Sequence, residues 1–147
     1  MWRTLIVAAL LAGCAQVPPS PQDIEAKKFE SIPGKSAIYV VRDLMSVRLG
    51  APLWLDQGAQ ITLFQGNYLR QVVEPGSHTI SGIGASTASI TIQAQAGKNY
   101  FVHFRVEGNV RMGVSNSALL MMDDQAGRAL VRQAVLVVPA APLKIEM

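Results

Sequence analysis

The segment Tyr100-Phe101-Val102-His103-Phe104-Arg105-Val106 carries the clearest secondary-structure signal in the chain. Every even-numbered residue in it is apolar or aromatic. A period of two is what a half-buried β-strand produces, because successive side chains point to opposite faces of the sheet. We therefore predict a strand here, with His103 on the face opposite to Val102 and Phe104, as a solvated or hydrogen-bonded surface histidine.

The same period extends back through the chain to Ala37. Further strands are predicted at 37–42, 52–56, 60–64, 68–73 and 89–93, and a return strand is predicted to start at His78. Gln57-Gly58 is a hairpin signal, and Glu74-Pro75-Gly76-Ser77 places proline and glycine where a type II turn needs them. Short strands with regular turn signals favour an all-β domain. We predict a small antiparallel β-sandwich, immunoglobulin-like or prealbumin-like, over residues 37–138.

The C-terminal part of the chain is less regular. Residues 118–122 resemble a strand and residues 123–127 a turn or short helix. Residues 128–138 fit a final strand, or a helix followed by a strand. Residues 139–147 are expected to be a tail, because Pro139 and Pro142 end the apolar run.

The N-terminus has the order of features found in an export signal. Arg3 is followed by about eight apolar residues and then by Gly13-Cys14. An apolar stretch of this length is too short to span a bilayer, which needs about twenty residues. Leu11-Ala12-Gly13-Cys14 resembles the lipobox of bacterial lipoproteins, in which the cysteine thiol receives diacylglycerol before cleavage. We expect residues 1–13 to be removed by a cut between Gly13 and Cys14.

Cys14 is the only cysteine in the chain, so the domain has to fold without disulfides. Two or three acyl chains on this residue give durable attachment to membrane lipid. Residues 14–36, with Pro18-Pro19 and Pro21, are expected to form the lipidated N-terminus and a tether. Ala15 follows the cysteine where an aspartate would be an inner-membrane signal, which by resemblance favours the outer membrane, facing the periplasm.

Four blocks of the sequence resemble one family in the same order. Ala37-Ile38-Tyr39-Val40-Val41-Arg42 resembles the opening of the DUF2846 lipoprotein family, and later blocks are similar at 66–69, 74–78 and 96–101. The resemblance covers about residues 36–132. It departs at Val41, where the family often has a second aromatic residue, and at Gln57-Gly58, where Asp-Gly is common. It implies a small β-sandwich on an envelope lipoprotein of uncharacterised function, and it supplies no catalytic residues.

The polar residues form no recognisable catalytic or metal-binding motif. His78 and His103 stand alone on separate strands, without ligand spacing. Gly82-Ile83-Gly84-Ala85-Ser86 is not a nucleophile elbow and is expected to be a loop. Asp123-Asp124 is expected to be a solvated turn. We predict no cofactor, no metal and no enzymatic activity.

The residues with the best claim to ligand binding are Trp54, Tyr68 and Arg70. Exposed aromatic rings could grip a glycan or peptide by stacking, although most rings in a sandwich of this size should lie in the core. Arg42, Arg70 and Arg105 could form an anion-binding rim, although outward-facing charges on strands are ordinary. The formal charge of +3 and the single basic doublet do not favour nucleic acid as a partner.

Three functions follow as hypotheses. The first is a membrane-anchored, non-catalytic structural or protein-interaction module, with an envelope protein or the cell wall as partner. The second is a binding module for a glycan, a peptidoglycan fragment or a peptide. The third is an enzyme acting on cell-wall polymers, which would need a pocket where acidic residues such as Asp56, Glu74 or Glu107 converge with polar partners.

Overall fold

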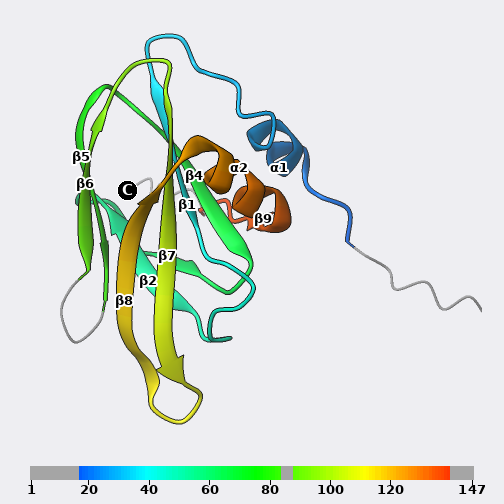
Figure 1. The fold of residues 1–147 in the computed structure, drawn as a ribbon, viewed down its shortest axis with the longest axis vertical. Helices are drawn as coiled ribbons and strands as arrows, with labels where there is room; N and C mark the ends of the chain where they lie inside the picture. Colours follow the sequence, from blue (N-terminus) through cyan, green and yellow to red (C-terminus); the bar gives the residue numbers. More distant parts are fainter. Residues whose placement is uncertain (1–16, 84–87, 140–147) are drawn as a thin grey trace, which may run out of the picture.

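The computed structural model describes residues 17–83 and 88–139 of the chain. They form two β-sheets packed face to face, with two helices on the outer side of one sheet (Figure 1). In chain order the elements are α1 (Pro21–Ala26), β1 (Ser36–Val41), β2 (Ala51–Leu55), β3 (Ile61–Leu63), β4 (Asn67–Val73), β5 (Gly76–Gly82), β6 (Ser89–Ala94), β7 (Asn99–Asn109), β8 (Gly113–Met122), α2 (Asp124–Gln133) and β9 (Val135–Leu136). The predicted β-sandwich is therefore confirmed.

The strands divide unequally between the two layers. Sheet A has the order β8-β7-β1-β4-β9, and sheet B has the order β3-β2-β5-β6. Sheet A is mixed rather than purely antiparallel, because β1 pairs in parallel with β7 and β4 pairs in parallel with β9. Between β1 and β7 the chain builds all of sheet B, so no hairpin forces the two strands to run in opposite directions.

The turn predicted at 74–77 is a crossing between the sheets. β4 belongs to sheet A, whereas β5 pairs with β2 and β6 in sheet B. The strand predicted from His78 is therefore present as β5, but it pairs in the other sheet and forms no hairpin with β4. Gly76 has a φ of 137°, which residues with a side chain rarely adopt, and this lets the chain change direction immediately after Pro75.

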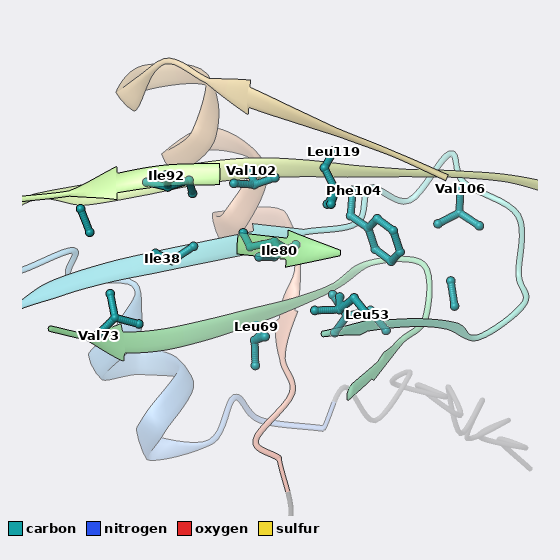
Figure 2. Packing of buried hydrophobic residues seen from close by; sticks show 14 residues of the cluster. Ile38, Leu53, Leu69, Val73, Ile80, Ile92, Val102, Phe104, Val106 and Leu119 are labelled. Carbon is teal, nitrogen blue, oxygen red and sulfur yellow. The ribbon is translucent and has the colours of Figure 1, made fainter. Parts of the chain in front are cut away.

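The main core lies between the two sheets (Figure 2). Sheet A contributes Ile38, Val102 and Phe104 to it, and each is at most 1% exposed. Ile80 and Leu53 meet them from sheet B. Burial of one such side chain stabilises the fold by about 1.5–3 kcal/mol. The even-numbered residues of β7 thus occupy the buried positions that the period of two predicts.

A second core lies between sheet A and the helices. Phe29, Tyr39 and Phe101 pack there, with ring centroids 5.5 Å apart for Phe29–Tyr39 and 5.0 Å apart for Tyr39–Phe101. Because sheet A is covered on both sides, all six residues of β1 are buried. Gly127 of α2 lies directly on Phe101, since a Cβ added there would be 2.2 Å from the ring.

The second core changes the expected domain boundary. Ser20 caps α1 by accepting a hydrogen bond from the Asp23 amide, and Asp23 and Phe29 are 2% and 5% exposed. Part of the stretch predicted as a tether at 14–36 is therefore packed on the domain, because apolar side chains on this segment cover sheet A. Helix α2 begins where Asp123 accepts a hydrogen bond from the Ala126 amide, so the predicted solvated turn at Asp123-Asp124 is a helix cap.

No helix among the described residues is long and apolar enough to cross a membrane. Gly13 and Cys14, together with the predicted signal at 1–13, lie outside the described residues, as does the tail beyond Pro139.

Candidate functional site

The structure separates the three residues predicted to bind a ligand. Tyr68 is fully buried under α1, where its hydroxyl donates a 2.6 Å hydrogen bond to Asp23 Oδ1. Burial and the neighbouring Asp23 carboxylate raise the pKa of Tyr68 well above its usual range. The Tyr68 ring is therefore not available to stack on a ligand, and its expected role was wrong.

Arg70 lies on the same side of sheet A, at the margin of the second core. Its Nε donates to the Tyr39 hydroxyl at 3.1 Å, and its guanidinium lies 5.8 Å from the centroid of the Tyr39 ring. A shallow hollow beside it is lined by Pro21, Gln22 and Glu25. Arg70 is thus used to hold Tyr39, and it does not meet Trp54.

Trp54 lies in sheet B. Its neighbours Leu53 and Leu55 point into the main core, so Trp54 projects from the outer face of that sheet and is half-buried. Its cross-strand partner is Ser81. Of the three predicted residues, it alone is on a face that the described helices do not cover (Figure 1).

Arg42 is not part of an anion-binding rim, because it is fully buried. Its guanidinium donates hydrogen bonds to the carbonyls of Val47, Leu49 and Leu63, and to Ser46 Oγ. Burial lowers the pKa of Arg42. The side chain holds the long β1–β2 connection against β3. Neither strand periodicity nor local spacing signals this role, since the acceptors are backbone atoms of other segments.

The two histidines lie in separate clusters. His78 Nδ1 is 2.8 Å from Asp56 Oδ2, and its Nε2 is 2.7 Å from the Glu74 carbonyl. His103 Nε2 is 2.6 Å from Asp43 Oδ2, in line with the predicted hydrogen-bonded histidine. Within 17–83 and 88–139, no group of three or more histidine, cysteine and acidic residues is placed to hold a metal.

One hollow on the molecule is a groove that the sequence did not predict. It has a volume of about 540 Å³ and lies between β3 and the segment that follows β9. Its lining is Leu55, Gly58, Ala59, Gln60, Ile61, Thr62, Gln71, Val137, Val138 and Pro139. None of these side chains ionises, so the groove offers apolar surface with a few amide and hydroxyl groups.

The groove is the open side of the sandwich. Among the described strands, β3 pairs only with β2 and forms one edge of sheet B, while β9 pairs only with β4 and forms one edge of sheet A. Both strands are short, and the groove lies between these two edges of the sandwich. No sequence pattern could have revealed this, because 55–62 and 137–139 come together only in the folded chain.

Comparisons with protein-family models, with curated proteins and with solved structures found no match. The resemblance to the DUF2846 lipoproteins therefore stays a prediction.

Proposed function

We propose that the protein is a lipid-anchored bacterial envelope protein whose β-sandwich is a non-catalytic interaction module. The anchor is Cys14, supported by the lipobox-like Leu11-Ala12-Gly13-Cys14 and the preceding apolar stretch. The observation that carries the interaction role is the groove between β3 and Val137–Pro139, which has a volume typical of binding sites.

The ligand best suited to this groove is an extended apolar segment of a partner protein. The side chains of Ile61, Val137 and Val138 provide apolar contact area, and burying it drives association. The edge of β3 that pairs with no described strand offers backbone groups to which an added strand can hydrogen-bond. A neutral groove recognises such a segment by shape and backbone pairing rather than by charge.

The position of helix α1 limits the distance between the β-sandwich and the membrane. Because α1 is packed on sheet A, the distance from Cys14 to the domain is limited by the number of residues between Cys14 and Ser20. Fully extended, they span about 20 Å. We therefore infer that the partner segment is presented close to the membrane that holds the acylated Cys14.

The anchor is tested by expressing the full chain in a bacterial host and measuring the mass of its N-terminal peptide. A diacylglyceryl-modified Cys14 with residues 1–13 removed is the expected result. Cys14→Ser should abolish both the modification and the cut. An unmodified Cys14 in the exported protein would remove the anchor from the proposal.

The groove is tested by selecting peptides from a displayed library on the immobilised protein and measuring their affinity. Val138→Glu should weaken the selected peptides about tenfold or more, because it places a charge among apolar contacts. Val110→Glu is the matched control, since Val110 is also exposed but lies on the β7–β8 turn outside the groove. Equal affinities for the two variants would rule out this groove as the peptide site.

The chain continues from Pro139 at the rim of the groove, so the assay is repeated with a protein that ends at Pro139. Removal of 140–147 should leave the difference between the two valine variants intact. Loss of that difference would show that the peptides bind the tail and not the groove.

A further inference from the structure

The outer face of sheet B has an unusual composition. Inward-pointing residues of each strand belong to the main core, so the alternate residues point outward. These are Pro52, Trp54, Thr62, Ser77, Thr79, Ser81, Ser89, Thr91 and Gln93. None is charged, although 16% of the chain is charged.

Hydroxyl groups lie on the β5 side of the single indole on this face. Ser81 is the cross-strand partner of Trp54, and Ser89 is the partner of Ser81 on the next strand. Two residues away on the same face of β5, Thr79 Oγ1 lies 3.0 Å from Oγ1 of Thr91 on β6. An aromatic surface therefore adjoins a grid of groups that both donate and accept hydrogen bonds.

One charged group, the Asp56 carboxylate, lies beside these hydroxyls and is hydrogen-bonded within the protein. Asp56 follows β2, and its carboxylate accepts hydrogen bonds from the Thr79 amide and interacts with His78. His78 has the same parity as Ile80 and so lies on the inner side of β5. Apart from the partly exposed Asp56 carboxylate at the end of β2, the outward surface thus offers a ligand neutral polar groups and one ring.

From this arrangement we propose that the outer face of sheet B binds an uncharged glycan chain, with Trp54 as its central contact. A pyranose ring has an apolar face of C–H groups and a rim of hydroxyls. The C–H face packs against the indole of Trp54, and the hydroxyl rim exchanges hydrogen bonds with Ser81, Thr79 and Thr91. An apolar peptide would take these hydroxyls out of water without offering them hydrogen bonds, and an anionic ligand finds no cation among the outward side chains. This site is separate from the groove and does not depend on the anchor.

Tryptophan fluorescence can report this site directly. The chain has two tryptophans, so the full chain carrying Trp2→Phe leaves Trp54 as the sole emitter. It is titrated, in a detergent without a sugar head group, with chitohexaose, cellohexaose and maltohexaose. A saturable change in emission with at least one of the three is expected. No change with any of them, together with no heat of binding by calorimetry, would overturn the proposal.

The hydroxyl grid is tested by isosteric loss of one hydroxyl. Thr91→Val should weaken the bound oligosaccharide about three- to tenfold, the effect of one hydrogen bond. Ser115→Val on β8 is the matched control, because Ser115 is exposed in the other sheet. Equal weakening by both variants would overturn the proposal, and unfolding midpoints show that each variant is folded. Val138→Glu should leave sugar binding unchanged, so failure of the groove and failure of this face can be told apart.

Discussion

At the scale of single residues, Arg42 shows how a polar side chain can organise the fold from within. It is fully buried and hydrogen-bonds three backbone carbonyls of the β1–β2 connection and of β3. Such a side chain is costly to bury, but its removal costs more because the carbonyls then lack donors. Arg42 is therefore a structural residue and not a ligand contact.

Arg42→Met should lower the free energy of unfolding by about 3–5 kcal/mol, since a buried polar network is left without its donor. Urea unfolding followed by circular dichroism measures the loss. Arg105→Met, at an exposed position of β7, should stay within about 0.5 kcal/mol of the wild type. A similarly small effect for Arg42→Met would contradict the role of this residue.

His78 and Asp56 form a clip between the β2–β3 turn and the crossing from β4 to β5. The hydrogen bond with the Asp56 carboxylate raises the pKa of His78, and the hydrogen bond with His78 lowers the pKa of Asp56. The contribution of His78 to stability is therefore fully present below its unfolded pKa, and it is lost as pH rises through the raised folded pKa. The contribution of Asp56 is present above its unfolded pKa and is lost as pH falls through the lowered folded pKa.

The clip should thus stabilise the fold most between about pH 4 and 6.5, the ordinary pKa values of the two groups. Relative to His78→Gln, the wild type should lose stability as pH rises above this window. The loss should stay under about 1 kcal/mol, because Asp56 is largely exposed and solvent screens the pair. Thermal unfolding of both proteins from pH 5 to 9 measures the difference, and a constant difference over that range would count against the clip.

At the scale of elements, the contact between α2 and β7 depends on the absence of a side chain at Gly127. A Cβ at this position would lie 2.2 Å from the Phe101 ring, and that ring is 1% exposed and cannot easily move. The close approach allows α2 to cover the second core. The contact requires glycine at this position, although glycine has a poor helix propensity.

Gly127→Ala should therefore destabilise the protein by about 1–3 kcal/mol, although alanine is the better helix former by about 1 kcal/mol. Hydrogen exchange should become faster in α2. The comparison is Ala129→Gly on the exposed side of the same helix, which should cost only about 0.5–1 kcal/mol. A gain in stability for Gly127→Ala would show that α2 is not held against Phe101.

At the scale of the whole molecule, the domain begins before its first strand. Residues 20–30 form part of the second core, and the Tyr39 hydroxyl donates to the Ala26 carbonyl at 2.9 Å. Asn99 also donates to the Phe29 carbonyl at 2.8 Å. The strands alone would leave one face of sheet A open to solvent.

A chain beginning at Ser20 should match the full-length protein in stability. A chain beginning at Ser36 should lose more than about 3 kcal/mol, because Phe29 alone contributes about 1.5–3 kcal/mol and Tyr39 and Phe101 become exposed. Urea unfolding of the two shortened chains makes the comparison. Equal urea midpoints for the two shortened chains would show that residues 20–35 do not stabilise the domain and belong to the tether.

The sequence by itself determined most of the strands up to residue 106 and the sandwich class, but only the second half of β8. The period of two in β7 and the turn residues before β5 are local signals, and each marks a strand with one face in the main core. It also supplied the lipobox-like Cys14 segment and the resemblance to the DUF2846 family, both of which remain predictions.

Only the tertiary structure decided the location of each candidate site. Tyr68 and Trp54 have similar local patterns, yet Tyr68 is buried beneath α1 and Trp54 projects from sheet B. The parallel pairing of β1 with β7, the burial of Arg42 and the groove beside Val138 likewise join segments far apart in the chain. Which face of a strand is covered depends on packing between layers. The alternation of apolar and polar residues within one strand does not indicate which element lies over either face.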